Sequence, residues 1–367
     1  MNRYFYYLVF INSITNIIVF APEMLLQDRY KGALASIVLA MPFFTLLLYL
    51  FNKAMYVFPG QPLPEILKTV MPPWVQKTIM LVSFPVWYVS GSMMLLVVSD
   101  IIQLVINPEM PVILNIGFLS FVVLFVVRYS SKTVLYGLEV FFWFIVPLMT
   151  FIFLKAMTDS KFSWHALMDA GGHFASTPTL FAFAAAGYSF AGFTDMFSFH
   201  QDFQGSYAAR HLWLIPVFNF IAVIMAFSIP IGMLGIEAVG DYKYPFISAS
   251  DSLSLKMGII ERVYFIFLIL YILISIINII VHWKVSYDLF RDMLRHQFQI
   301  QRLTKSTRVC LAVFFLFPFI IYWIFNDYQL IMFVKYWLLL LVLFELFWVG
   351  TVMYAAAVFK RREAPAQ

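Results

Sequence analysis

The stretch Asn12-Ser13-Ile14-Thr15-Asn16 places amides and hydroxyls in the middle of the first apolar segment of the chain. A second stretch, Ala184-Ala185-Ala186-Gly187-Tyr188-Ser189-Phe190-Ala191-Gly192, brings small and polar residues into an apolar segment near mid-chain. Backbone at membrane depth leaves helical geometry only where it is buried in protein or lines a cavity. Interrupted segments at corresponding positions of two halves are typical of transporter-like binding sites. The two stretches therefore predict two broken membrane helices around one ligand site.

Composition assigns the chain to the α-helical membrane proteins. Of its 367 residues, 63% are hydrophobic and 12% are charged, which is about half the charged fraction of a soluble protein. The sequence predicts an all-α polytopic protein with a single transmembrane domain over residues 1–367. About ten apolar segments are long enough to span a bilayer, at residues 4–25, 32–57, 76–106, 111–128, 133–157, 176–199, 208–236, 260–287, 306–325 and 330–359.

Several kinds of chemistry find no support in the residues. Cys310 is the only cysteine, which excludes a disulfide within the chain and a cysteine-cluster metal site. The six histidines have no metal-ligand spacing, and no catalytic triad or phosphate-binding glycine loop is present. The first apolar segment is too long for a cleavable signal peptide. We therefore expect no enzymatic activity, no catalytic residues, no cofactor and no metal.

Lys and Arg are distributed unevenly between the two sides of the expected membrane topology. With ten spans both termini share a side, and that side holds 16 of the 24 Lys and Arg residues. Because cytoplasmic loops carry such an excess, both termini are expected in the cytoplasm. Lys284 to Arg308 is the most basic expected loop, and a loop of this kind can also bind anionic membrane lipid. The net charge of +5 reflects this topology and does not indicate a nucleic-acid partner.

The order of the segments predicts an inverted five-plus-five repeat. The first repeat covers about residues 1–157, the second about 176–325, and the last helix about 330–359. The repeat follows from the positions of the broken helices, because no sequence identity between the halves is visible. Between spans, residues 61–73 predict a short cytoplasmic surface helix, and residues 240–258 predict an outer loop that can cap an external vestibule.

Candidate ligand-binding residues lie on spans one, three, six and eight, which would face the cavity in such a repeat. In span eight, Tyr271, Ser275 and Asn278 share one helix face, and a polar face of a membrane helix points to the bundle interior. The candidates are Ser13, Thr15, Asn16, Tyr88, Gly91, Ser92, Gly187, Tyr188, Ser189, Gly192, Tyr271 and Ser275. The alternative for these residues is close packing through small side chains and hydrogen bonding between helices.

Acidic residues within the spans are functional candidates because a carboxylate is costly in lipid. They are Glu23, Asp100, Glu139, Asp195 and Glu345. Asp195 follows Gly192 by about one turn and is the candidate for coupling the ligand to an ion. Glu345 lies near the middle of the last span without an obvious cationic partner, so we expect a protonated, hydrogen-bonded structural residue. Few charges are expected in the cavity, which favours a small zwitterion or a sugar as ligand.

Four short motifs occur in the order and spacing of a known family. They are YVFPGQPLPEILKTVMP at 56–72, INPEMPVIL at 106–114, SFAGFTDMFSF at 189–199 and DYKYPF at 241–246. With these motifs the chain resembles, over essentially its whole length, the B subunits of spore germinant receptors. These are the endospore germination permeases of the amino acid–polyamine–organocation superfamily.

The resemblance implies a LeuT-like fold in the spore inner membrane or cell membrane. It also implies a subunit that binds a small germinant, often an amino acid, within a complex with A and C subunits. The family's ligand residues lie on spans one, three, six and eight. Many members carry Phe-Gly-Glu in span six, whereas here Asp195 stands two positions later than the family acid. A proton- or sodium-coupled amino-acid transporter is the alternative, since it requires the same cavity.

Overall fold

The computed structural model describes residues 3–203, 211–253, 263–295 and 300–363. Every regular element among these residues is a helix. The elements are α1 (Arg3–Asn16), α2 (Phe20–Gln27), α3 (Ala33–Met55), α4 (Leu63–Val70), α5 (Pro73–Ile101), η1 (Ile102–Ile106), α6 (Val112–Val127), α7 (Ser131–Met157), α8 (Trp164–Gly172), α9 (Leu180–Tyr188), η2 (Ala191–Phe193), α10 (Met196–Phe199), η3 (His200–Asp202), α11 (Leu214–Leu234), η5 (Ala238–Asp241), α12 (Pro245–Asp251), α13 (Val263–Arg295), α14 (Ile300–Ile324) and α15 (Asp327–Glu363).

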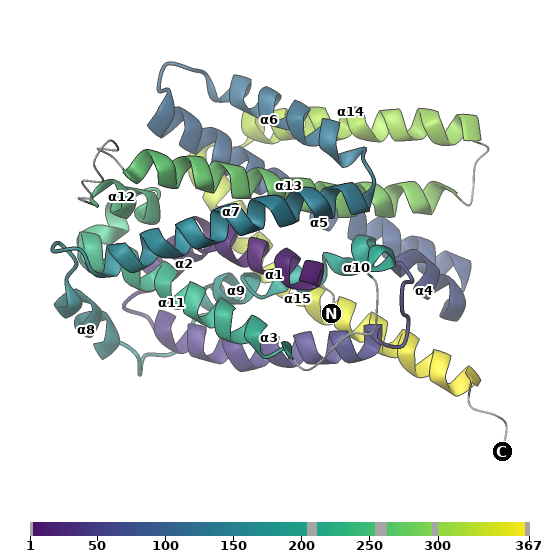
Figure 1. Ribbon diagram of the computed structural model, residues 1–367, viewed down its shortest axis with the longest axis horizontal. Coiled ribbons are helices and arrows are strands. Elements are labelled where there is room, and N and C mark those ends of the chain that lie inside the picture. The colour runs from purple at the N-terminus through teal and green to yellow at the C-terminus, as the bar shows by residue number, and fades with distance from the viewer. Residues whose placement is uncertain (1–2, 204–210, 254–262, 296–299, 364–367) are drawn as a thin grey trace.

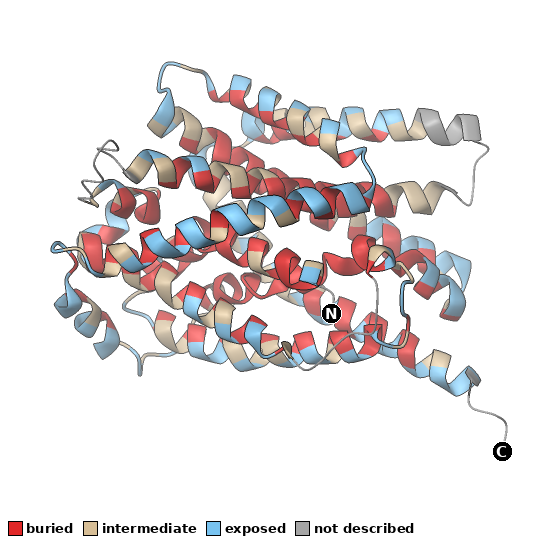
Figure 2. Ribbon diagram, viewed as in Figure 1, coloured by how far each residue is buried: buried red, intermediate tan, exposed pale blue. Residues whose placement is uncertain are grey.

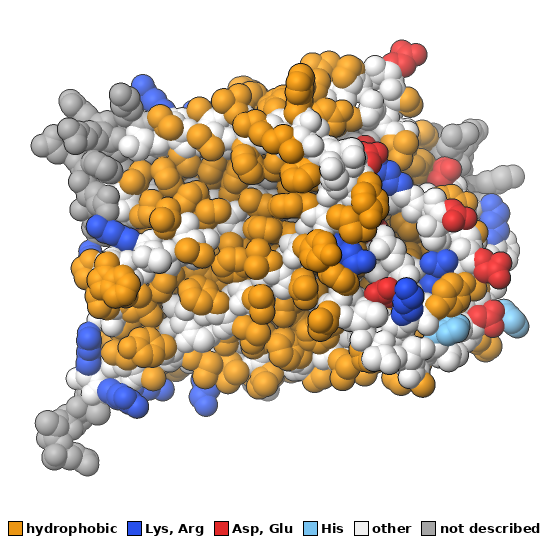
Figure 3. All heavy atoms as spheres, turned by 180° about the vertical axis from the view of Figure 1, so that it is seen from behind, with side chains coloured by type: hydrophobic (Ala, Val, Ile, Leu, Met, Phe, Trp, Pro, Cys, Tyr) orange, Lys and Arg blue, Asp and Glu red, His pale blue; other side chains and the backbone are white. Residues whose placement is uncertain are grey.

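The expected membrane segments correspond to helices of this structure. In the described part of the chain, seven helices are long and apolar enough to cross a membrane, and two bent helix pairs raise the count to nine. The shorter apolar helix α6 occupies the position of the fourth expected span. A broad apolar belt covers the middle of the face seen in Figure 3. The chain is therefore an all-α integral membrane protein.

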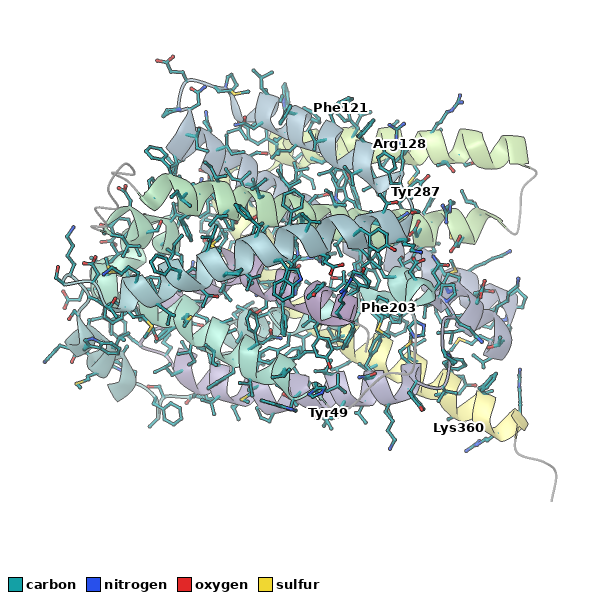
Figure 4. All side chains as sticks on the ribbon, in the orientation of Figure 1. Tyr49, Phe121, Arg128, Phe203, Tyr287 and Lys360 are labelled. Atoms are coloured by element: carbon teal, nitrogen blue, oxygen red, sulfur yellow. The ribbon has the colours of Figure 1, made fainter. Side chains whose placement is uncertain are left out.

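The connections between spans gather at two opposite ends of the bundle. Figure 1 shows α8 and α12 at one end, and α4 with the C-terminal end of α15 at the other. Figure 4 places Arg128, Tyr287 and Lys360 in the half of the molecule that contains α4. The face in Figure 3 has Lys and Arg at this end, and a mixture of acidic, basic and His side chains at the opposite end. The assignment of the α4 end to the cytoplasm stays a prediction.

Burial separates a central group of helices from an outer group (Figure 2). In α1 nearly every residue from Phe5 to Asn16 is buried, and α5 packs along α13. The outer helices α6 and α7 expose large apolar side chains such as Phe118, Phe121 and Trp143. In a membrane protein this exposed apolar surface faces lipid. The broken helices therefore lie inside the bundle, shielded from lipid.

The first break lies after the polar stretch and not within it. Residues from Asn12 to Asn16 are helical in α1, and the chain leaves helical geometry at residues 17–19. The axes of α1 and α2 then differ by 49°. Pro22, in the first turn of α2, has no N–H to donate to the carbonyl of Ile18, and its ring disfavours the preceding helical turn. The proline thus accounts for the position of the break, which the sequence interpretation placed too early.

The second break lies inside the expected stretch. Helix α9 ends at Tyr188, and the following segment turns by 43°. The N–H of Phe190 bonds to the carbonyl of Gly187 at 2.8 Å, which tightens the chain into a 3₁₀-type turn. A Cβ on Gly187 would come within 2.0 Å of the Phe44 ring. Glycine therefore allows α9 to pack closely on α3 before the chain bends.

The connections differ from their expected form in one important place. The expected basic loop from Lys284 to Arg308 is mostly helical, because α13 continues to Arg295 and α14 begins at Ile300. Lys284 is only 2% exposed and its Nζ lies 2.9 Å from Asp288 Oδ1, one turn along the helix. The expectation of a loop at Lys284 was wrong, because a neighbouring carboxylate neutralises this charge inside the bundle.

The short surface helix expected within residues 61–73 is present as α4.

Candidate ligand-binding site

Two asparagines of α1 connect the broken helices to each other. The Asn12 amide donates to the carbonyl of Tyr188 at 2.9 Å. The Asn16 amide donates to the carbonyl of Ala185 at 3.3 Å and to the hydroxyl of Ser189 at 2.7 Å. The last carbonyls of a helix have no partner within that helix, and inside a membrane they must find one in the protein. The polar stretch of span one therefore satisfies the end of α9.

A cavity lies beside these contacts, with about 360 Å³ of empty space that includes space open to solvent. Its walls come from spans one, three, six and eight, and the final helix α15 closes it. The lining residues are Asn12, Val86, Trp87, Ser90, Tyr188, Ala191, Gly192, Thr194, Asp195, His282, Leu341, Phe344, Glu345 and Trp348. We call this space the central cavity. Its mostly apolar wall with a few polar groups is typical of a small-molecule site.

Two carboxyl groups face the central cavity. The Trp87 indole donates to Asp195 Oδ1 at 2.8 Å, and the Thr194 hydroxyl donates to Glu345 Oε1 at 3.0 Å. Asp195 is 2% exposed and Glu345 is 7% exposed. The second oxygen of each carboxyl group, Asp195 Oδ2 and Glu345 Oε2, is buried without a hydrogen-bond partner. Such orphaned oxygens are costly unless a ligand or proton satisfies them.

His282 supplies a further acceptor on the cavity wall. Its Nδ1 lies 2.9 Å from the carbonyl oxygen of Asn278, which can only accept, so Nδ1 carries the hydrogen. In the neutral ring Nε2 is then an acceptor, and its protein partner is the Tyr188 hydroxyl at a long 3.4 Å. The Asn278 amide donates to Asn12 Oδ1 at 3.4 Å, which fixes the asparagine at the break.

Three of the expected site residues line the central cavity, namely Tyr188, Gly192 and Asp195. Gly192 also packs against α1, where an added Cβ would lie 2.8 Å from Asn12 Cβ and 3.0 Å from Val9 Cα. The glycine therefore serves the close contact of span six with span one as well as the cavity.

The other candidates on spans one and six do not line the central cavity and are packed among neighbouring helices. Thr15 donates to the carbonyl of Ile11 within its own helix at 2.8 Å. Ser13 Oγ is buried without a hydrogen-bond partner. Asn16 and Ser189 bond to each other, and Gly187 faces Phe44. A direct contact of these residues with a ligand stays a prediction.

The candidates on spans three and eight are also set back from the cavity, with different partners. The Tyr88 hydroxyl donates to the carbonyl of Phe314 on α14 at 3.0 Å, and Ser92 donates to the carbonyl of Tyr88 at 2.8 Å. Gly91 leaves room for Trp283, whose Cδ1 would lie 2.6 Å from an added Cβ. Tyr271 is fully buried with its hydroxyl 3.7 Å from Met94 Sδ, and Ser275 Oγ is buried without a partner.

Several lining residues were absent from the sequence-derived site, and one pattern would have found His282. Tyr271, Ser275 and Asn278 form a stripe at helical spacing, and His282 continues it by four residues. No comparable pattern identifies Trp87 or Trp348, because isolated tryptophans are common in membrane helices. Glu345 was recognised as an unusual residue, but its position on the cavity wall beside Thr194 depends on how α15 packs on the broken span.

A second cavity lies between Phe20, Glu23 and the segment before α12. We call it the outer cavity; its empty space amounts to about 670 Å³, which includes space open to solvent. Lys243 Nζ lies 2.9 Å from Asp100 Oδ2 and 3.0 Å from Asp327 Oδ2, and the Tyr244 hydroxyl donates to Asp100 at 2.7 Å. Burial lowers the pKa of Lys243, but its bonds to Asp100 and Asp327 raise that pKa by more, so the ammonium stays charged.

The geometry can now be compared with known proteins. A family model described as spore germination protein matches residues 3–330. The chain belongs to the spore germination permease family. The family expected from the short loop motifs is thereby confirmed. No curated protein sequence matches the chain.

The fold of this family member is also found in a solved transporter structure. That structure is Mhp1, a nucleobase-cation-symport-1 family transporter, in a closed conformation with bromovinylhydantoin bound. The TM-score is 0.56 at 12% sequence identity, and the match covers 89% of this chain and 73% of Mhp1. The similarity confirms the LeuT-like fold with broken helices in spans one and six. The family and the neighbour are of the permease type, which is not enzymatic.

Proposed function

We propose that this spore germination permease binds a small nutrient germinant in the central cavity and signals through partner A and C subunits in the spore inner membrane. The observation that carries the proposal is the central cavity itself, which lies at the junction of two broken helices in a chain of this family. Ligand groups that enter it would contact Asn12, Asp195 and His282 on three different spans.

A sensor requires only that the ligand binds two conformations with different affinity. The central cavity fits this requirement because its walls include residues on both sides of the second break, from Tyr188 to Asp195, and a movement there relative to α5 and α13 would change the cavity. A ligand that joins Asp195 on the broken span to Glu345 on α15 would favour the conformation in which these helices meet. Partner subunits would respond to that change.

A proton- or sodium-coupled amino-acid transporter is the second candidate. The shared fold with a cation-symport family transporter favours it, as does Asp195, a carboxyl group next to a helix break. Coupling sites of such carriers lie near the membrane midplane beside broken helices. Both functions require the same cavity, and transport is the property that separates them.

The test combines spores with purified protein. Spores that lack this chain are expected to lose germination with one class of nutrient, and the intact gene restores it. The purified protein in liposomes is expected to show no accumulation of that nutrient when a pH or sodium gradient is imposed. Gradient-driven uptake that Asp195→Asn eliminates would replace the sensor by the coupled transporter. Unchanged germination with every nutrient would contradict the germinant-binding function.

A further inference from the structure

The polar groups around the central cavity are mainly hydrogen-bond acceptors. Asp195 Oδ2 and Glu345 Oε2 are buried and unpartnered, and His282 Nε2 has only a distant hydroxyl. These three atoms belong to three different elements, the broken span six, α15 and α13, which meet at this cavity. The ligand must therefore bring donors to it.

Several donors of the cavity wall are already engaged, although the Trp348 indole N–H is buried without a hydrogen-bond partner. The Trp87 indole and the Thr194 hydroxyl bond to the carboxyl groups, and the Asn12 amide bonds to the carbonyl of Tyr188. No Lys or Arg is among the described residues that line the cavity. A ligand carboxylate or phosphate would therefore find two carboxyl groups and no Lys or Arg, and like charges at close range repel each other.

A primary ammonium group has the complementary chemistry. It offers three N–H donors and one positive charge, with no acceptor. Hydrogen bonds between charged partners are about twice as strong as neutral ones. An ammonium group would thus satisfy the orphaned oxygens and compensate the charge that two buried carboxyl groups cannot carry alone. A sugar hydroxyl supplies one donor and no charge, so it fits the cluster less well.

We infer that the central cavity is a binding site for a protonated primary amine, held by Asp195, Glu345 and His282. The inference rests on the proposed ligand-binding function and narrows its substrate class. It also implies that the ligand's carboxylate is dispensable, because the described wall has no Lys or Arg to receive it and Nε2 of the neutral His282 ring is an acceptor. The sequence predicted a cavity with few charges, whereas this site contains two carboxyl groups. The sequence also predicted a structural role for Glu345, whereas the amine site makes it a ligand-binding residue.

The test uses matched probes on the full-length protein in lipid nanodiscs. L-Alaninamide, L-alanine and L-lactamide share one skeleton but carry a cation, a zwitterion and a neutral hydroxyl, and the same trio is prepared on the leucine skeleton. Calorimetry should show that an amide binds at least as tightly as its amino acid. The hydroxy amide should bind about 10- to 100-fold more weakly, the range expected for a lost charged hydrogen bond.

The variants assign the effect to the carboxyl pair. Asp195→Asn and Glu345→Gln keep the acceptors for Trp87 and Thr194, and each should weaken amide binding by about 10- to 100-fold. Thermal unfolding of both variants shows whether they are folded. Glu23→Gln is the matched control, since Glu23 lines the outer cavity, and it should change amide affinity by less than about twofold.

Several outcomes would overturn the amine site. The hydroxy amides could bind as tightly as the amides, or their binding could be accompanied by proton uptake. Both carboxyl variants could bind the amides as well as the unchanged protein does. Finally, none of the amine probes could bind. A further variant, Leu341→Trp, fills the central cavity with a larger side chain. Its effect on binding distinguishes a failure of the amine site from a failure of the proposed ligand-binding function. If it abolishes binding of a neutral ligand, the cavity is a ligand site without amine preference. If it leaves all binding unchanged, both proposals fail.

Discussion

Acidic side chains line both the outer and the central cavity, but among the described lining residues only the outer cavity has a lysine. Lys243 lies between Asp100 and Asp327, so the outer cluster is complete within the protein. The central carboxyl groups of Asp195 and Glu345 each retain a buried oxygen without a partner. A buried charge needs a partner of opposite sign. This difference between the two clusters is the basis for the proposed amine site.

The largest effect is expected from a variant that places a lysine in the central cavity. Glu345→Lys places an ammonium in the same cavity as Asp195. The side chain should occupy the amine position, so binding of L-alaninamide is expected to fall by about 100-fold or more in calorimetry. Thermal stability should stay equal or rise. A variant that still binds the amide normally would show that Asp195 and Glu345 do not share one ligand position.

The converse change removes the cation from the outer cavity. Lys243→Met leaves Asp100 and Asp327 without their shared ammonium, and about 2 kcal/mol of stability should be lost because Lys243 and Asp100 are partly buried, although Asp327 is exposed. Chemical unfolding in detergent measures the loss. Lys31→Met, at an exposed lysine, is the control and should change stability by less than about 0.5 kcal/mol. Equal effects of both variants would mean that the outer pairs contribute nothing specific.

A third variant separates the frame of the central cavity from its ligand groups. Asn16 bonds to Ala185 and Ser189 at the second break but does not line the cavity. Asn16→Ala should lower stability by about 1–2 kcal/mol, since a buried helix-end carbonyl loses its donor. Amide affinity, measured at a temperature where the variant is folded, should change little. A large loss of affinity with normal stability would place Asn16 in the ligand site.

The smallest effect is expected at an exposed ion pair. Arg3 Nη2 lies 2.9 Å from Glu139 Oε1, but the Arg3 side chain is 60% exposed. Arg3→Ala should therefore lower stability by less than Lys243→Met does, and high salt should reduce the difference further. Unfolding curves at low and high salt provide the measurement. A loss larger than that of Lys243→Met would contradict the role assigned to burial in the comparison of the two cavities.

The sequence alone determined the membrane class, the positions of the spans and the existence of two broken helices. Hydropathy and helix-breaking residues act over a few neighbours, so they are visible in the order of residues. The stripe from Tyr271 to Asn278 likewise pointed to the bundle interior, and His282 extends it onto the cavity wall. The loop motifs were sufficient to indicate the family that the family model then confirmed.

The contacts of the buried polar groups depend on the tertiary structure and could not be predicted from the sequence. Asn16, a candidate ligand residue, and its neighbour Asn12 both donate to the end of α9, more than 160 residues away in the chain. Glu345 lies 151 residues from Thr194 and meets it because α15 packs on the broken span. Lys284 is buried against Asp288 despite its charge. In a membrane interior each polar group must find a protein partner, and which partner is near depends on which helices meet.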